Sequence, residues 1–326
     1  MIGTFFLATL VAILSFGCGD KPDRAINAKL TKVNLQLNWK PEPQFGGFYA
    51  AAAKGIYRKY GLDVTITPGG AGTPTVEMIG AGTVPFAIVS GDEILRARSQ
   101  GNRVVALFAV YQTNPQGIMT RASRGLKSLD ELFAHPGILA LERGLPYADF
   151  LERKYGFQKL KIVPAPFGDL TLYRTMEDYS MQCFVTSEPL AAKRMGVEPQ
   201  TFLMAESGYN PYTTVLATSE GFLEANSGIV ESMVHAVREG WEAYLNDSSE
   251  ANKQMGKLNP TMDAQTFAES AEAQRPLIQS ADTARFGLGA MTLERWQTLG
   301  QQLVELQAID RPIAPEAIFI QPLRKK

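Results

Sequence analysis

Residues 33–66 read VNLQLNWKPEPQFGGFYAAAAKGIYRKYGLDVTI, and the periodicity of this stretch indicates the fold. Residues 33–37 alternate apolar and polar side chains, which is the period of a β-strand. The alanine-rich segment 48–60 has the composition of a helix and stops at Gly61, and residues 62–66 read as a second strand. A strand, a helix and a strand in this order predict a parallel βαβ unit.

The same order of elements continues beyond this stretch. Further strands are expected at 84–89, 104–110, 137–141, 161–164, 183–186 and 203–206, with helices between them, and the chain is mostly helical after residue 225. The pattern predicts parallel α/β sheets, which bind ligands beyond the carboxyl ends of their strands. The loops at 39–47, 68–73 and 90–93 are then expected at one edge.

Length and charge limit the classes of protein to consider. The chain has 326 residues, which is long enough for about two domains. Its 32 basic and 33 acidic residues give a formal net charge of -1. Binding to a phosphate backbone needs a surplus of Lys and Arg, so we expect no nucleic acid partner.

The N-terminal segment 2–17 is apolar or small throughout and carries no charge. It is shorter than the about 20 residues that span a bilayer and is typical of a secretory signal. It ends before Cys18, which resembles a lipoprotein processing site at which Cys18 is acylated. No Lys or Arg precedes the apolar run and Phe16 replaces a small residue, so a cleaved signal with an incidental cysteine and an uncleaved anchor stay open. We expect an exported protein on the periplasmic side of a bacterial membrane, with a lipid anchor on Cys18.

The sequence carries no signal of catalysis or metal binding. Its two histidines, His135 and His235, are too far apart for a local zinc site or a catalytic triad. Besides Cys18 the only cysteine is Cys183, and a catalytic thiol needs a nearby histidine base. We therefore expect Cys183 to be a packing residue, and we expect no enzyme activity, no cofactor and no metal.

Aromatic and polar residues gather in the loops at the expected ligand edge. Aromatic faces stack on planar rings, and each pair contributes about 0.5–1.5 kcal/mol beyond area burial. The aromatic candidates are Trp39, Phe45, Tyr49, Tyr147, Phe167, Phe184, Tyr209 and Tyr212. The polar candidates, each of which could equally serve packing or solvation, are Gln44, Asp92, Glu93, Glu142, Thr186 and Glu188. The glycine-rich turn 69–72 is either a tight turn or a backbone site for a polar ligand group.

Several of these segments together resemble one family. Residues 37–41 (LNWKP), 44–49 (QFGGFY) and 60–64 (YGLDV) resemble the opening of the thiamine-pyrimidine precursor (NMT1/THI5-like) family of ABC-importer binding proteins, which is related to the fungal pyrimidine synthase. The segments 186–190 (TSEPL), 208–212 (GYNPY) and 287–291 (GLGAM) are similar to that family as well. The likeness extends over about residues 33–320.

The resemblance implies an α/β periplasmic-binding-protein fold of type II, with two lobes joined by a two-strand hinge. After a signal at 1–18 and a tether at 19–30, one lobe would hold 31–116 and 217–326, and the other 117–216. By matching motif positions, the ligand-binding residues would be Trp39, Gln44, Phe45, Tyr49, Asp92, Glu188, Tyr209 and Tyr212.

The resemblance also implies a function. The chain would be the extracytoplasmic solute-binding protein of an ABC importer, a monomer that serves a permease and an ATPase and binds an aminopyrimidine precursor of thiamine. Two departures qualify this expectation: Phe45 stands where the pyrimidine-binding members usually have His, and the Cys-rich iron motif of the synthases is missing. The first leaves riboflavin or another planar ring open, and the second argues against synthase activity. A sulfonate or nitrate ligand and a sensory lipoprotein of the same fold remain as alternatives.

Overall fold

The computed structural model describes residue 1, residues 30–166 and residues 168–320. The expected signal, the tether up to residue 29, Cys18 and Phe167 therefore lie outside the described residues. No helix in the described ranges is long and apolar enough to cross a membrane.

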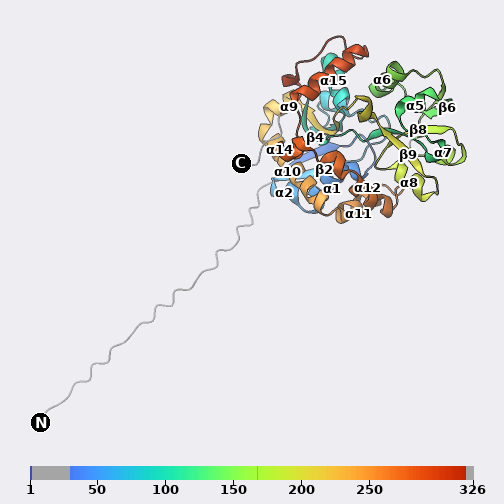
Figure 1. Ribbon diagram of the computed structural model, residues 1–326. Helices are drawn as coiled ribbons and strands as arrows, with labels where there is room; N and C mark the ends of the chain where they lie inside the picture. Colours follow the sequence, from blue (N-terminus) through green and yellow to red (C-terminus); the bar gives the residue numbers. More distant parts are fainter. Residues whose placement is uncertain (2–29, 167, 321–326) are drawn as a thin grey trace.

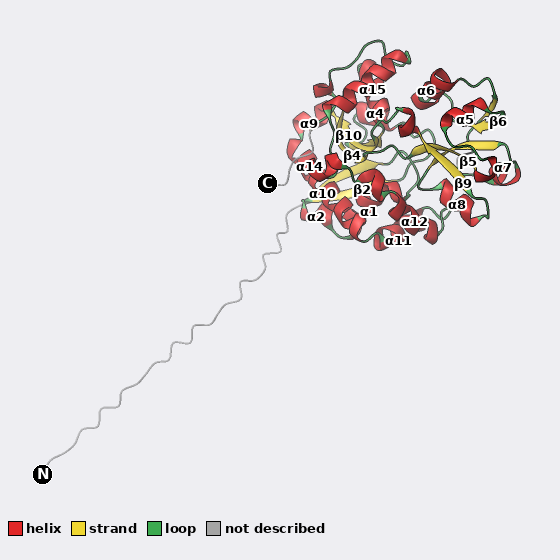
Figure 2. Ribbon diagram, in the orientation of Figure 1, coloured by secondary structure: helices red, strands yellow, loops and turns green. Residues whose placement is uncertain are grey.

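Two five-stranded sheets form the centres of two lobes (Figures 1 and 2). The first sheet has the order β2-β1-β3-β10-β4, and its strands are β1 (Thr31–Gln36), β2 (Leu62–Thr67), β3 (Phe86–Val89), β4 (Val104–Tyr111) and β10 (Thr213–Ser219). The second sheet has the order β7-β6-β8-β5-β9, and its strands are β5 (Gln116–Arg121), β6 (Gly137–Ala140), β7 (Leu160–Val163), β8 (Tyr179–Phe184) and β9 (Pro199–Leu203).

Helices cover both faces of each sheet, as the red ribbons around the yellow strands in Figure 2 show. The helices with the first sheet are α1 (Gly46–Ala53), α2 (Ile56–Lys59), α3 (Thr75–Gly80), α4 (Gly91–Ser99), α9 (Glu220–Ala225), α10 (Ser227–Asn246), α11 (Ser249–Leu258), α12 (Ala264–Ala273), α13 (Arg275–Ile278), α14 (Ala281–Phe286) and α15 (Leu293–Glu305). Those with the second sheet are α5 (Leu129–Ala134), α6 (Pro146–Tyr155), α7 (Thr171–Thr175) and α8 (Glu188–Arg194).

Strand β3 shows why both faces need cover. All four of its residues are buried; Ala87 and Val89 belong to one core cluster, and Phe86 and Ile88 to the cluster on the other face. Successive side chains of a strand point to opposite faces, so an unbroken apolar run is stable only between two layers of helices.

The chain passes between the two sheets at residues 112–115 and again at residues 204–212. These two crossings match the expected two-strand hinge of a type II fold. The second crossing returns the chain as β10, which runs antiparallel between β3 and β4. In the second sheet, β5 is likewise antiparallel to β8 and β9. The sheets are therefore mixed. The expectation of parallel α/β sheets holds for β1, β2 and β3 and for β6, β7 and β8, but not for the pairs made by β10 and β5.

Two of the expected strand positions also differ from the structure, and β10 is an additional strand. The strand expected at 183–186 is β8 at Tyr179–Phe184, and the strand expected at 203–206 is β9 at Pro199–Leu203. Residues Met204–Ser207 instead form a short 3-10 helix. Strand β10 was not expected, because it follows the Gly208–Tyr212 loop without a helix and so breaks the strand-helix order.

Candidate ligand-binding site

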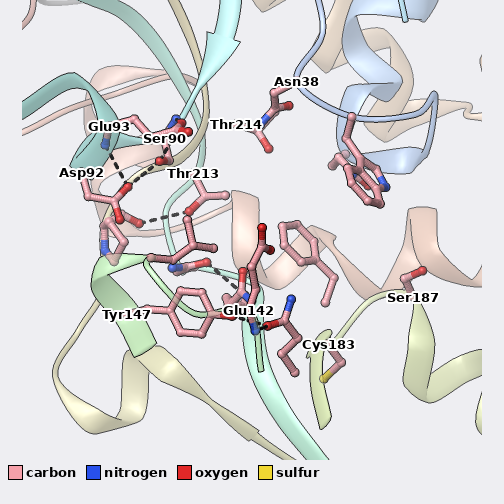
Figure 3. Close-up of a pocket in the computed structure, with 18 of the residues that line it drawn as sticks. Asn38, Ser90, Asp92, Glu93, Glu142, Tyr147, Cys183, Ser187, Thr213 and Thr214 are labelled. Carbon is pink, nitrogen blue, oxygen red and sulfur yellow. Dashed lines mark hydrogen bonds between the residues drawn. The ribbon is translucent and has the colours of Figure 1, made fainter. Parts of the chain in front are cut away.

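A cavity of about 300 Å³ lies between the two lobes and is lined by both sheets and both crossings (Figure 3). From the first lobe it receives Asn38, Trp39, Glu42, Gln44, Phe45, Ser90, Asp92, Glu93 and Arg96. From the second lobe it receives Gln116, Glu142, Leu145, Pro146, Tyr147, Pro166, Gly168, Met181, Gln182, Cys183, Phe184, Ser187 and Glu188, and the crossings and β10 add Asn114, Tyr209, Pro211, Thr213 and Thr214. Its volume is at the lower end of the range of small-molecule pockets.

Among the described residues, five aromatic rings line this cavity, and they come from both lobes and the hinge. They are Trp39, Phe45, Tyr147, Phe184 and Tyr209. Trp39 and Phe184 are partly exposed, so each has ring surface available to a ligand. Phe45 is instead buried in the hydrophobic core of the first lobe. This arrangement suits a planar ring held between the lobes.

Glu42 supplies a carboxylate next to the ring of Trp39. It lies between Pro41 and Pro43, and its Oε1 accepts hydrogen bonds from Trp39 Nε1 at 3.2 Å and from Asn259 Nδ2 at 3.4 Å. Burial, with the Glu188 carboxylate nearby, raises the pKa of Glu42 to about 7. A ligand that donates hydrogen bonds or carries positive charge would stabilise the ionised form of this group.

Glu188 lies at the first residue of α8 and reaches back to the end of β8. Its Oε2 accepts a hydrogen bond from the backbone amide of Phe184 at 2.9 Å, which fixes the carboxylate against the pocket wall. Burial raises the pKa of Glu188 as well. The cavity is therefore lined by two carboxyl groups, one from each lobe, whose ionisation is disfavoured by burial.

The N-terminus of α4 forms another wall, where Figure 3 shows Ser90, Asp92 and Glu93 together. The backbone amide of Ser90 donates to Glu93 Oε2 at 2.7 Å, and the Ser90 hydroxyl donates to Asp92. Tyr209, from the second crossing, donates from its hydroxyl to Asp92 Oδ2 at 3.1 Å. A helix N-terminus ordinarily attracts an external anion. Here the helix's own carboxylates occupy that position, which disfavours a ligand anion.

The charged side chains around the cavity are mostly acidic. The carboxylates are Glu42, Asp92, Glu93, Glu142 and Glu188, and the only cation among the described lining residues is Arg96. Hydrogen-bond acceptors thus predominate, and the site suits a ligand that is rich in donors or is cationic.

Cys183 lines the cavity from β8 but is only 3% exposed and packs in the core of the second lobe. Burial, followed by the nearby Glu188 carboxylate, raises the pKa of its thiol well above the ordinary value. The thiolate is the nucleophilic form of cysteine, so this environment disfavours nucleophilic chemistry. Within the described ranges, no group of three or more His, Cys, Asp or Glu residues could hold a metal ion.

Six of the eight residues expected from the sequence to bind a ligand meet at this cavity, namely Trp39, Gln44, Phe45, Asp92, Glu188 and Tyr209. The structure does not bring the other two there. Tyr49 is buried in a hydrophobic core cluster of the first lobe, outside the lining. Tyr212 lies under the guanidinium of Arg295 and its hydroxyl accepts from the amide of Thr292, also outside the lining.

The glycine-rich loop at 68–73 does not contribute to the lining either. Gly69 packs so closely on the chain at Leu37 that a Cβ there would meet the Leu37 carbonyl oxygen at 2.2 Å. This supports the reading of the loop as a tight turn, where glycine is needed for space.

Sequence reasoning missed three lining residues with clear chemistry, Glu42, Arg96 and Gln182. Glu42 lies inside the 39–47 loop that was expected at the ligand edge, so its place between two prolines was a usable signal. Gln182 was hidden because the strand was expected to begin at residue 183. Thr214, another lining residue, has a φ of 55°, which is rare for a β-branched residue and marks β10 as a constrained part of the site.

The two lobes and the cavity between them have the architecture of the type II periplasmic-binding-protein fold. The chain superimposes on the periplasmic aliphatic sulphonate binding protein SsuA of Escherichia coli with a TM-score of 0.67 at 12% identity, over 90% of this chain and 94% of SsuA. At that identity the likeness concerns the fold alone.

A family model described as NMT1/THI5 like matches residues 42–251, and the chain belongs to this family. The riboflavin-binding protein RibY of Chloroflexus aurantiacus is 25% identical over 311 residues, which cover 89% of this chain and 85% of RibY. The formylaminopyrimidine-binding protein of Halalkalibacterium halodurans is 21% identical over 324 residues, which cover 96% of this chain and 97% of that protein.

An enzyme gives a shorter match. The 4-amino-5-hydroxymethyl-2-methylpyrimidine phosphate synthase of Legionella pneumophila is 23% identical over 33% of this chain and 34% of its own length. The two relatives that align along most of the chain are binding proteins.

Proposed function

We propose that this chain is the extracytoplasmic solute-binding protein of an ABC importer and that it binds a small aromatic heterocycle between its lobes. An aminopyrimidine precursor of thiamine is the first candidate ligand. The observation that carries the proposal is the cavity itself, in which aromatic rings from both lobes surround carboxylates that accept hydrogen bonds. An aminopyrimidine offers a flat ring for the aromatic side chains and an amine that donates to Glu42 or Glu188.

Riboflavin is the second candidate, and one specific observation favours it. Phe45 stands at the motif position where the pyrimidine-binding members usually have His, so the wall at this point is apolar. A larger fused ring gains more from such a wall than a single pyrimidine does, because apolar burial scales with area. The likeness to RibY supports the same candidate.

Anionic ligands fit this cavity less well. A sulfonate or nitrate needs donors and positive charge, whereas the described lining of the cavity has five carboxylates and one arginine. The amide of Ser90 at the start of α4 already donates to Glu93. The likeness to a sulphonate-binding protein therefore supports the fold and not the ligand.

The transport role completes the proposal. We propose that the chain is exported, acylated at Cys18, and works as a monomer that delivers its ligand to a permease driven by an ATPase. We further propose that the lobes divide within residues 112–115 and 204–212, because β10 belongs to the first sheet. This moves the second boundary, first expected after residue 216, to before Thr213. The proposal includes no catalytic step, which accords with the burial of the Cys183 thiol.

A thermal-shift screen tests the proposal. The panel contains hydroxymethylpyrimidine, formylaminopyrimidine, thiamine, riboflavin, taurine and nitrate. A ligand at about 100 times its Kd stabilises the folded state by about 2.7 kcal/mol, which gives a readable shift. A shift with a ring compound supports the proposal, and a shift with taurine or nitrate alone would refute the ligand class.

A further inference from the structure

The pocket contains one glutamine whose amide cannot rotate freely. Gln182 lies on β8, and its Oε1 accepts a hydrogen bond from the backbone amide of Glu142 at 2.6 Å and another from the hydroxyl of Tyr147. A backbone N–H can only donate, so the side-chain atom facing it must be the oxygen. The nitrogen Nε2 then has to point the other way.

Tyr147 keeps this orientation at any physiological pH. Its ring is buried at 5% exposure, and burial raises the pKa of its hydroxyl, so the phenol stays protonated and donates. A flipped amide would place an N–H group against the Glu142 backbone N–H and lose that bond, and the Tyr147 hydroxyl would have to turn from donor to acceptor. The Gln182 amide is therefore held before any ligand arrives.

The freed end of the amide faces the cavity. Among the described residues Nε2 has no protein acceptor, and it is not one of the buried polar atoms that lack a partner, so it is reachable from the lined space. Two other donors at the site are already used, because Trp39 Nε1 donates to Glu42 and the Ser90 hydroxyl donates to Asp92. Gln182 thus adds a fixed donor to a cavity in which acceptors predominate.

The position of Gln182 relative to Phe184 indicates what it can contact. Both lie on β8 two residues apart, so their side chains share one face and are about 6–7 Å apart along the strand. Met181 and Cys183 alternate with them and pack in the core of the second lobe. A planar ligand lying against Phe184 would present its edge, and not its face, to the Gln182 amide.

We infer that Gln182 is a specificity-determining residue of the site, which selects planar rings that carry an in-plane acceptor, a ring nitrogen or a carbonyl oxygen, on the edge next to Phe184. Tyr147 is the positioning residue that acts through it. This inference rests on the proposed function. An acidic pocket with aromatic walls also suits quaternary ammonium compounds. These compounds offer no hydrogen-bond acceptor, so the Gln182 donor would distinguish ring heterocycles from them.

The test uses purified full-length protein in mild detergent and isothermal titration with formylaminopyrimidine, riboflavin and choline as probes. The variants are Gln182→Glu, Gln182→Leu and Tyr147→Phe. Gln182→Glu keeps the shape and the oxygen that accepts from Glu142 and Tyr147 but replaces the donor by an acceptor. Gln182→Leu removes the donor without adding charge. Circular dichroism and the Tm of each variant report whether it folds.

We expect both Gln182 variants to weaken binding of the ring probe by about tenfold or more, because each leaves the acceptor of the ligand unpaired. Tyr147→Phe should weaken binding of the ring probe by a smaller factor. The same substitution should have no further effect on binding in the Gln182→Leu background. A purely structural role of Tyr147 would instead give the same factor in both backgrounds.

The outcomes that overturn the inference are distinct from failure of the proposed function. If wild type binds a ring probe and both Gln182 variants bind it within twofold, or if only Gln182→Glu is weakened, Gln182 does not select an acceptor. If choline binds as tightly as the ring probes and Gln182→Leu does not change its affinity, Gln182 again does not select an acceptor. If wild type binds neither formylaminopyrimidine nor riboflavin, the proposed function fails and the inference fails with it.

Discussion

Arg295 in α15 donates from Nε to the carbonyl oxygen of Asn210 at 2.8 Å, within the second crossing between the lobes. The same guanidinium donates to the carbonyl of Gln112 in the first crossing and lies 3.9 Å over the ring of Tyr212. One side chain therefore joins both segments about which the lobes must move. Arg295 is half-buried in the hinge, and burial lowers the pKa of its guanidinium.

Replacing this arginine is expected to weaken the whole fold. Arg295→Met leaves the carbonyls of Gln112 and Asn210 without their charged donor, so the free energy of unfolding should fall by about 3 kcal/mol. Urea denaturation followed by circular dichroism measures this. Arg311→Met, at an exposed position, is the matched control and should change stability by no more than about 0.5 kcal/mol. An equal loss of unfolding free energy in both variants would show that Arg295 does not stabilise the hinge.

Trp39 is expected to contribute to binding by ring contact. Trp39→Ala should weaken the affinity for the ring ligand by about 1–3 kcal/mol through lost stacking and lost apolar area. Tyr49→Phe is the control, because Tyr49 lies outside the cavity and its buried hydroxyl has no hydrogen-bond partner among the described residues. Titration calorimetry compares the two. If Trp39→Ala retains wild-type affinity, Trp39 is not a ligand contact.

Glu42 should make the stability of the unliganded protein depend on pH. Its pKa in the folded state is about 7, above the ordinary value of 4.5, so between these values the folded state binds a proton that the unfolded state has released. Stability from this group is therefore lost as pH rises from about 4.5 to about 7. Burial raises the pKa of Glu188 and of Glu93 too, which gives the same sign.

The test of this pH dependence compares Tm values of wild type and Glu42→Gln between about pH 5 and pH 8. The Tm of the variant should rise relative to that of wild type as pH increases, because the variant has no carboxyl group to ionise at this position. Glu316→Gln, which changes an exposed carboxylate, should follow wild type throughout. Parallel curves for wild type and Glu42→Gln would refute the prediction.

Arg194 joins the lobes at their rim. From α8 in the second lobe it donates to Glu269 Oε2 in α12 at 2.5 Å, and Asp263 Oδ2 lies 3.5 Å away. Surface ion pairs contribute only about 0–1 kcal/mol, so Arg194→Ala should hardly change the unfolding free energy. It should instead favour the open arrangement of the lobes, which small-angle X-ray scattering detects as a larger radius of gyration at low salt.

Salt provides the internal check of this rim contact. Screening weakens exposed ion pairs, so wild type at about 1 M salt should approach the Arg194→Ala variant. Arg174→Ala, on the exposed side of α7, should leave the scattering curve unchanged. No difference between wild type and Arg194→Ala at low salt would show that the contact does not hold the lobes together.

Cys183→Ser tests for chemistry at the site. Because the thiol is buried and held protonated, the variant should keep the ring affinity of wild type, and neither protein should turn the ligand over. Chromatography of the ligand after prolonged incubation measures turnover. Conversion by wild type that the variant lacks would assign catalysis to Cys183.

The fold was largely predictable because strong local signals carry it. Residues 84–89 and 104–110 are uninterrupted apolar runs, and they contain the buried strand β3 at Phe86–Val89 and lie within the buried strand β4. The antiparallel β10 was not predictable in this way, because its direction depends on how the chain crosses between lobes and not on its own sequence. The hydrophobic pattern of a single sequence does not show how the chain crosses between the lobes.

The site was predictable where a loop motif brought residues together, as for Trp39, Gln44 and Phe45. It was not predictable where the side chain depends on packing. Tyr49 follows Phe45 by one helical turn, yet it is buried in the core of the first lobe and not in the cavity. Gln182 acquires its role only through contacts with Glu142 and Tyr147, which are about 40 residues away in the chain.

The most direct test of the central claim is isothermal titration of wild-type protein with formylaminopyrimidine, riboflavin and taurine. The account predicts that one of the two ring compounds binds with a Kd of about 1 µM or below and that taurine gives no heat of binding. Binding of taurine alone would contradict it, since a cavity with five carboxylates and a carboxylate-capped helix would then hold an anion.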